Sequence, residues 1–242
     1  MFDQSKCLFT GGSGLLGGEF KKLLPEMSYP STCEFDLTDP AMMEAYLAGR
    51  NISLVVHAAA FTSPPRINED PQRALDVNII GTANLVKLCA RFGIKLIYIS
   101  TDYVFRGDQG MYQESDPVYP VNKYAWSKLG GECAVRLYDN SLIIRTTFGP
   151  NEFPFEKAFV DQWTSRESVA ITARMITELL DKDVTGTIHV GGPRKTVYGY
   201  AKGISPLKEI GELSINDVAF AVPVDTSLDC SRYQQLLGAK KA

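Results

Sequence analysis

The 242-residue sequence has no long apolar run, only two histidines and no excess of positive charge. No stretch approaches the ~18 apolar residues that a membrane helix needs, so we expect no membrane partner. Its 25 lysine and arginine residues stand against 28 aspartate and glutamate residues, which argues against a nucleic-acid-binding surface. Neither histidine lies in a cluster with metal-ligand spacing, and we expect no metal site.

Cysteine is also sparse, with five residues that are scattered and have no CxxC spacing. An odd, dispersed set predicts reduced thiols rather than a disulfide framework. No motif ties a histidine to one of them, so a catalytic cysteine is disfavoured. The first residues lead directly into an expected strand without the features of a secretory signal. Together these features favour a cytoplasmic protein.

The first 150 residues alternate short β-rich runs with segments of helical spacing. We expect strands at 6–10, 52–58, 94–99 and 142–144, and helices at 18–24, 76–92 and 122–138. Such alternation predicts an α/β fold with a Rossmann-type, doubly wound parallel sheet and right-handed crossovers. Ligands of such sheets bind at the carboxyl ends of the strands.

The pattern is less regular after Pro150. A helix is expected at 168–180 and a strand at 186–190. We therefore expect a dinucleotide-binding domain over residues 1–150 and a small C-terminal substrate-binding lobe over 151–242. Within this lobe, a part at about 168–192 is expected to return to the sheet.

Glycines recur at every third position after the first expected strand, at Gly11, Gly14 and Gly17. This spacing lets the backbone approach a pyrophosphate, and the helix N-terminus that follows offers unpaired N–H groups to it. A glycine-rich turn needed for backbone reasons alone is the alternative. About twenty residues later, Asp36 suggests a carboxylate on the ribose of NAD. Alternatively, that acidic segment caps a helix, with Asp39 as N-cap and Pro40 in the first turn.

Tyr124 and Lys128 are four residues apart on one expected helix face, and Thr101 follows the strand at 94–99. A tyrosine with an ordinary pKa of ~10 needs about 4 kcal/mol of phenolate stabilisation to titrate near pH 7. A lysine ammonium ~5 Å away supplies roughly 3 kcal/mol at an effective dielectric constant of ~20. Thr101 is a candidate donor to a substrate carbonyl. Alternatively, Tyr124 is simply half-buried and Lys128 solvated.

These motifs together resemble the extended short-chain dehydrogenases/reductases. They are the TGGSGLLG turn at 10–17, HAAA at 57–60, Asn78, STDYVF at 100–105 and YAWSK at 124–128. STDYVF followed by YQE at 112–114 is similar to the branch of dTDP-4-dehydrorhamnose reductases in particular.

The resemblance implies reduction of the C4 ketone of a nucleotide-linked 4-keto-6-deoxy sugar by a nicotinamide cofactor. It implies catalytic roles for Thr101, Tyr124 and Lys128, with Lys128 also holding the nicotinamide ribose. It places Asp102 near the sugar. The cofactor-binding residues that it implies, with the glycines above, are Ser13, Leu15, Leu16, Ser31, Asp36, Leu37, Ala59, Ala60 and Phe61.

The resemblance also places Asp36 and Leu37 at the adenine, so that Ser31 and Thr32 would face the ribose. No carboxylate is then expected to oppose a 2′-phosphate, and NADP(H) is favoured over NAD(H). The chain is shorter than the family after Pro150. The family's aromatic residue near the sugar has Phe148 as its nearest candidate, and Val222 stands where an arginine is expected.

The expected function is that of a soluble NAD(P)H-dependent reductase of deoxysugar biosynthesis, such as the making of rhamnose for polysaccharides. A homodimer is compatible with it. One alternative is a sugar-nucleotide epimerase or dehydratase on the same fold. Another is a non-catalytic regulatory subunit that binds a dinucleotide.

Overall fold

The computed structural model describes residues 3–218 and 222–238, and its chain forms two compact units. The first unit comprises the residues up to Ser100 together with Pro120–Ile144 and Leu179–Thr187. The second comprises Thr101–Tyr119, Arg145–Glu178 and the residues from Ile188 on. No helix in the described ranges is long and apolar enough to cross a membrane.

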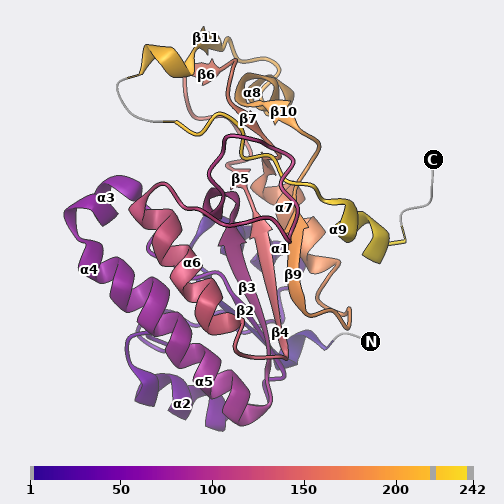
Figure 1. Cartoon of the computed structure of the whole chain (residues 1–242). Coiled ribbons are helices and arrows are strands. Elements are labelled where there is room, and N and C mark those ends of the chain that lie inside the picture. Colours follow the sequence, from indigo (N-terminus) through magenta and orange to yellow (C-terminus); the bar gives the residue numbers. More distant parts are fainter. Residues whose placement is uncertain (1–2, 219–221, 239–242) are drawn as a thin grey trace. The chain divides into compact units, whose positions relative to one another are not determined.

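A five-stranded sheet in the order β1-β2-β3-β4-β9 forms the centre of the fold (Figure 1). Its strands are β1 (Cys7–Thr10), β2 (Leu54–His57), β3 (Lys95–Thr101), β4 (Ser141–Thr146) and β9 (Gly186–Val190). β1 pairs with β2 and β2 with β3 in parallel, as the strand-helix alternation predicts. The α/β Rossmann-type prediction is confirmed. β3 continues two residues beyond its predicted end, so Ser100 and Thr101 belong to the strand.

The order of the strands reverses at β1. After α1 the chain returns to one edge of β1, where Ser28 forms a parallel bridge with Leu8. β2 pairs in parallel with the opposite edge of β1. The Phe9 amide donates to the Ser28 carbonyl at 2.8 Å. The carboxyl end of β1 is thus the topological switch point at which such sheets bind ligands.

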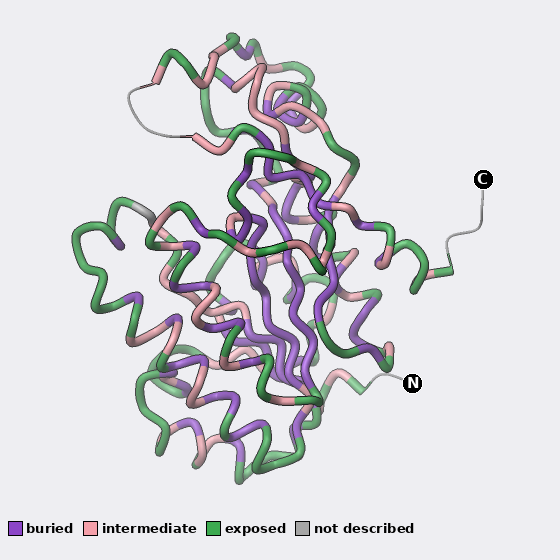
Figure 2. Tube along the Cα trace, in the orientation of Figure 1, coloured by how far each residue is buried: buried purple, intermediate pink, exposed green. Residues whose placement is uncertain are grey.

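Helices of the first unit pack on both sides of the strands. They are α1 (Leu15–Leu23), α2 (Pro40–Ala48), α3 (Pro64–Glu69), α4 (Pro71–Ala74), α5 (Thr82–Phe92) and α6 (Lys123–Val135), preceded by the 3₁₀ turn η1 (Gln4–Lys6). Leu8, Val55 and Leu96 share a core with residues of α2, α5 and α6. On the opposite face, Phe9 lies 4.6 Å from the Phe20 ring of α1. The strands of the sheet are buried along most of their length (Figure 2).

Local capping residues explain where these helices begin and end. Asp39 accepts a hydrogen bond from the Met42 amide with Pro40 at the first position, as expected. Asn122 accepts from the Ala125 amide at the start of α6. Gly93 ends α5 with φ of 68°, a left-handed conformation that favours glycine.

The helix predicted at 76–92 is present, but it is not α-helical throughout. Its first part, η2 (Leu75–Gly81), is a π-helical segment that joins α4 to α5 without a break. In Figure 1 this composite helix runs alongside α6. π-Helical segments often occur at functional sites because they re-aim side chains.

The second unit carries short paired strands and a separate apolar core. Its elements are η3 (Asp102–Val104), β5 (Phe148–Gly149), β6 (Lys157–Phe159), β7 (Trp163–Thr164), β8 (Glu167–Ser168), α7 (Val169–Thr177), β10 (Lys195–Thr196), α8 (Val197–Ile204), β11 (Gly211–Leu213), η4 (Ile215–Asp217) and α9 (Ser231–Leu236). β5 pairs with β8, β6 with β11 and β7 with β10. Phe153, Val197, Tyr200 and Ile210 belong to its core.

Candidate active site

The glycine turn between β1 and α1 needs glycine at two of its three spaced positions. Gly11 has φ of 82°, and a Cβ there would lie 2.8 Å from the Ala59 amide nitrogen. A Cβ on Gly17 would lie 2.6 Å from the Gly11 carbonyl oxygen. The turn therefore packs directly on the chain after β2, and α1 packs directly on the turn.

The N-terminus of α1 fits an anionic group of a dinucleotide. Gly14 is its N-cap and supplies no side-chain acceptor for the first N–H groups of the helix. Ser13 and Leu15 are exposed beside it. Leu16 is buried in the interior, so only its backbone is available at this turn.

A buried hydrogen-bonded chain joins the ends of β1 and β2. The Thr10 hydroxyl lies 2.7 Å from His57 Nδ1, and His57 Nε2 lies 3.0 Å from the Thr82 hydroxyl. Burial lowers the pKa of His57 to about 3, so its ring is neutral at pH 7. His57 thus positions the strand ends.

Asn78, in the π-helical segment, links the chain after β2 to α6. Its side chain accepts from the Phe61 amide at 2.7 Å and donates to the Phe61 carbonyl at 2.9 Å. It also donates to the Ser127 hydroxyl at 2.8 Å. This bridge orients Ala59, Ala60 and Phe61 relative to the helix that carries Tyr124.

Lys128 is 3% exposed, and Tyr124 precedes it by one turn of α6. The Lys128 ammonium lies 4.0 Å from the centre of the Tyr98 ring in β3, a cation–π contact. Burial lowers the pKa of Lys128 to about 7, and the negative charge of Glu132 opposes that shift. The alternative of a solvated lysine is wrong, because the ammonium is enclosed between α6 and the sheet.

The adenosine end of the expected dinucleotide site contains a carboxylate that the sequence interpretation did not include. Glu34 accepts hydrogen bonds from the Ser31 amide at 2.9 Å and from the Ser31 hydroxyl at 2.8 Å. A carboxylate therefore lies beside Ser31, and the expectation that none opposes a 2′-phosphate there stays a prediction. Thr32 beside it is exposed.

Asp36 is hydrogen-bonded within its own turn, and Leu37 is packed in the core. Asp36 accepts from the Thr38 amide and hydroxyl, both at 2.8 Å. Leu37 is buried in the core of the first unit, so its side chain is not available to a ligand. Their placement at an adenine stays a prediction.

In the second unit, the hydroxyl of Thr101 donates to Asp102 at 3.1 Å, and Thr226 donates to the other oxygen of that carboxylate at 2.7 Å. Burial raises the pKa of Asp102 above its ordinary value, while hydrogen bonds from Thr226 and the charge of Arg166 act in the opposite direction. Asp102 thereby orients the Thr101 hydroxyl. Phe148 is half-buried in β5.

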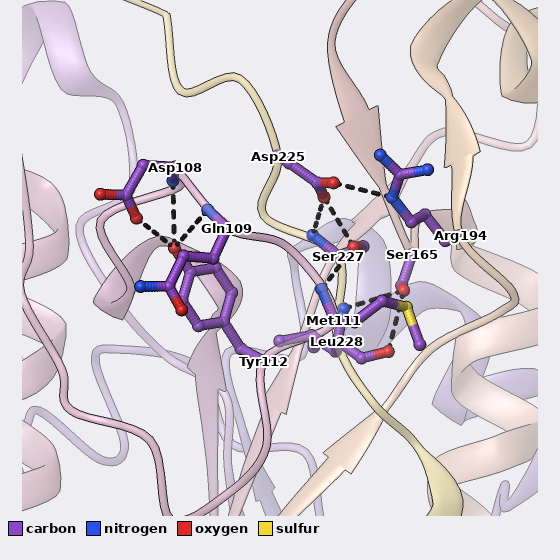
Figure 3. Close-up of polar contacts among 9 residues, drawn as sticks. All are labelled: Asp108, Gln109, Met111, Tyr112, Ser165, Arg194, Asp225, Ser227 and Leu228. Atoms are coloured by element: carbon purple, nitrogen blue, oxygen red, sulfur yellow. Dashed lines mark hydrogen bonds and ion pairs between the residues drawn. The ribbon is translucent and has the colours of Figure 1, made fainter.

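Hydrogen bonds hold the segment that contains Thr226 in place within the second unit (Figure 3). Asp225 accepts from Arg194 at 2.7 Å and from the Ser227 hydroxyl at 2.6 Å, and Ser227 accepts in turn from the Met111 amide at 2.8 Å. The Arg194 guanidinium stacks 3.7 Å from the Trp163 ring centre. These contacts fix Thr226 opposite Asp102.

The loop before Met111 is organised around one phenol (Figure 3). The Tyr112 hydroxyl accepts from the amides of Gly107, Asp108 and Gln109 and donates to the Asp108 carboxylate at 2.8 Å. No group of three metal-ligating side chains occurs in the ranges 3–218 and 222–238. All five cysteines are free thiols.

The family described as "RmlD substrate binding domain" matches residues 5–219. The chain belongs to this family. A hypothetical dTDP-4-dehydrorhamnose reductase from Sulfolobus tokodaii has the same fold, with a TM-score of 0.83 and 31% identity over 95% of this chain and 94% of that one. The resemblance to dTDP-4-dehydrorhamnose reductases is confirmed.

Two further proteins are similar to this chain. The dTDP-4-dehydrorhamnose reductase of Bacillus anthracis, solved in complex with NADP, has a TM-score of 0.83 and 24% identity, and the match covers 98% of this chain and 97% of that one. Subunit beta of methionine adenosyltransferase 2 from Bos taurus is 29% identical over 96% of this chain and 82% of that protein.

Sequence reasoning found the glycine turn and the Tyr124–Lys128 pair but missed several polar partners. Ser127, Glu132, Glu34 and Thr226 were not singled out as site residues, and Asn78 was noted only as part of a motif. Only Glu132 had a signal in the sequence, because it follows Lys128 by one helical turn.

Proposed function

We propose that the chain is an NAD(P)H-dependent oxidoreductase that reduces the C4 ketone of a nucleotide-linked 4-keto-6-deoxy sugar, as dTDP-4-dehydrorhamnose reductases do. One observation carries the proposal: a buried lysine lies one helical turn from Tyr124, in the same unit as a glycine turn at the switch point of the sheet. Membership of the RmlD family supports it.

The residues at the turn suit a nicotinamide dinucleotide. A Cβ at Gly11 or Gly17 would clash with backbone, and the uncapped start of α1 offers N–H groups to a pyrophosphate. In this proposal Ala59, Ala60 and Phe61 line the middle of the cofactor, and Ser31 its ribose end. When bound, the cofactor supplies the hydride. NADP(H) is the expected form, since the Bacillus anthracis relative holds NADP, with NAD(H) as the alternative.

In the proposed mechanism, Tyr124 donates its phenolic proton to the alkoxide that forms at C4. The resulting phenolate is stabilised by the Lys128 ammonium one turn away. At an effective dielectric constant of ~20, that ammonium contributes roughly 3 kcal/mol. Thr101 hydrogen-bonds the C4 oxygen, and Asp102 and Phe148 contact the sugar. The hydroxyl of Thr101 must turn from Asp102 to donate to the substrate.

The proposal extends to the pathway and the location. The nucleotide-sugar substrate belongs to deoxysugar biosynthesis for a polysaccharide or glycan in the cytoplasm, and a homodimer is compatible with this activity. Residues 1–150 form the dinucleotide-binding domain, and residues 151–242 form a small substrate-binding lobe that adds to the sugar contacts of Thr101, Asp102, Tyr124 and Phe148.

The decisive experiment follows the absorbance of NADPH and of NADH with a panel of 4-keto-6-deoxy sugar nucleotides. Net oxidation of the cofactor, one equivalent per ketone reduced, is expected for at least one substrate. An epimerase would change the sugar without net consumption of NADPH. A dehydratase would consume no NADPH while it released water.

A second candidate is a non-catalytic regulatory subunit that binds a dinucleotide. The bovine relative favours it, because that protein is a subunit of an adenosyltransferase and matches 96% of this chain. Dinucleotide binding with no oxidation for any sugar, together with a change in the rate of a methionine adenosyltransferase on mixing, would favour this second function.

A further inference from the structure

Glu132 is a buried carboxylate that the proposed mechanism does not use. It lies on α6 one turn after Lys128 and two turns after Tyr124, so the three side chains share one face of the helix. Glu132 is 0% exposed and Lys128 is 3% exposed. A fully buried carboxylate takes up a proton unless neighbouring groups stabilise its charge. The neighbours of Glu132 therefore determine which role its carboxyl group can have.

Ser100, near the end of β3, is a hydrogen-bond donor to Glu132. Its hydroxyl donates to Glu132 Oε1 at 2.5 Å. Hydrogen bonds between a hydroxyl and a carboxylate are characteristically short and strong. Because side chains alternate along a strand, Ser100 and Tyr98 lie on the same face of β3, toward α6. The same face of the sheet thus holds both the carboxylate and the lysine.

In the part of the chain that the structure describes, titratable groups that interact with Lys128 include His57 from β2, Tyr98 from β3 and Glu132 from α6, on which Tyr124 also lies. His57 is neutral because burial lowers its pKa to about 3. Burial raises the pKa of Tyr98 well above its ordinary value, so Tyr98 is neutral too. Among these groups, Glu132 supplies the negative charge that opposes loss of the lysine proton.

We propose that Glu132 is a positioning residue that keeps the Lys128 ammonium protonated near pH 7 and so sets the pH range in which Tyr124 can act. The Cα of Glu132 is about 12 Å along the helix axis from that of Tyr124, twice the spacing between the Cα atoms of Lys128 and Tyr124. Glu132 therefore opposes the phenolate less than Lys128 favours it. The catalytic consequence rests on the proposed function, whereas the effect on Lys128 does not.

Direct NMR titration of the lysine side chains tests the proposal in the full chain. Lysine is labelled with ¹³C at Cε, and the Lys128 signal is assigned by its loss in Lys128→Met. In Glu132→Gln, which keeps the shape of the side chain, the Lys128 midpoint is expected to fall by about one pH unit or more. Glu132→Asp keeps the charge on a shorter side chain. Its Lys128 midpoint is expected to lie between those of Glu132→Gln and the wild type.

A matched surface variant controls for the loss of one negative charge. Glu44→Gln removes a carboxylate that pairs with Arg91 at 2.7 Å on the exposed side of α2 and is expected to leave the Lys128 midpoint unchanged. A Lys128 midpoint that is the same in Glu132→Gln as in the wild type would overturn the proposal. If Glu132→Gln does not fold, the same comparison is made with Glu132→Met, which also removes the carboxylate and keeps a similar length, and an unchanged midpoint there has the same meaning.

Enzyme kinetics separate this inference from the proposed function. With an active wild type, the alkaline limb of the kcat profile is expected to move to lower pH in Glu132→Gln, with kcat changed more than KM. Reduced thermal stability with an unmoved alkaline limb would show a merely structural role. If no sugar is reduced by the wild type while the Lys128 midpoint still shifts, the proposed function fails and the inference about Glu132 stands.

Discussion

At the scale of single residues, burial determines which side chains carry charge. His57, Lys128 and Glu132 are all enclosed by the first unit, yet each has different polar neighbours. His57 bonds two hydroxyls that are satisfied by its neutral ring, whereas Lys128 lies over an aromatic face and one turn from a carboxylate. The lysine can therefore be charged near neutral pH while the histidine cannot.

Tyr124→Phe tests the proton donor. The substitution removes only the phenolic hydroxyl, so kcat for ketone reduction should fall by about 100-fold or more, while NADPH affinity stays nearly unchanged. Stopped-flow or steady-state absorbance gives kcat, and fluorescence titration gives the dissociation constant. Tyr46→Phe, on α2, is the control that should retain turnover. Wild-type turnover in Tyr124→Phe would remove Tyr124 from the mechanism.

Glu34→Gln tests the adenosine end of the site. Glu34 is exposed, so solvent partly screens its charge at Ser31, and a modest effect is expected. Removing the charge should raise the preference for NADPH over NADH by about 3- to 5-fold. The ratio of the two kcat/KM values measures it, with Glu44→Gln as the charge-matched control. An unaltered ratio would show that Glu34 does not face a 2′-phosphate.

At the scale of elements, local signals predicted much of the first unit. Alternation of β-rich and helical segments placed the sheet strands, and Asp39, Pro40 and Gly93 act at helix ends as local rules require. The glycine turn was predictable for the same reason. Its glycine spacing and its strain lie within a few residues of β1 and α1, whereas its contact with Ala59 is made with the chain after β2.

Several polar contacts could not be predicted from local signals, because they depend on the folded arrangement of the chain. Asn78 reaches Phe61 and Ser127 only because a π-helical segment turns it toward α6. Glu34 caps Ser31 through a turn whose geometry no periodicity encodes. Thr226 and Asp102 are 124 residues apart in the sequence and meet only in the folded second unit.

Gly11→Ala tests the close approach of the glycine turn to the chain after β2. A Cβ would lie 2.8 Å from the Ala59 nitrogen in addition to the strain of φ at 82°. We expect a loss of about 2–3 kcal/mol in the free energy of unfolding and a weakened dinucleotide affinity. Chemical denaturation and ligand titration measure the two effects.

Gly93→Ala is the matched control for Gly11→Ala. Gly93 also has a positive φ, of 68°, but a Cβ there meets nothing within 4 Å. It should lose only about 1–2 kcal/mol and bind the dinucleotide as the wild type does. Equal effects of the two substitutions on affinity would contradict the role of the Gly11 contact.

At the scale of the whole molecule, the buried lysine links stability to pH. Burial lowers the pKa of Lys128 from 10.5 to about 7, so between these values the unfolded chain binds more protons than the folded one. Stability should therefore rise with pH through that window. Above pH 9 the buried thiols of Cys7, Cys89 and Cys230, with pKa values raised to about 12, act in the opposite direction.

Lys128→Met isolates this contribution between pH 7 and 9. The wild type should gain about 2 kcal/mol in the free energy of unfolding relative to the variant over these two pH units. Denaturant unfolding at both pH values measures the difference. Parallel pH dependence in the wild type and the variant would mean that Lys128 is not buried in its neutral form above pH 7.

The most direct test of the central claim is the NADPH absorbance assay with 4-keto-6-deoxy sugar nucleotides, run on the wild type and Tyr124→Phe side by side. The account predicts stoichiometric NADPH oxidation by the wild type and almost none by the variant, at equal cofactor occupancy. No oxidation by the wild type with any ketone of this class, despite bound NADPH, would contradict it.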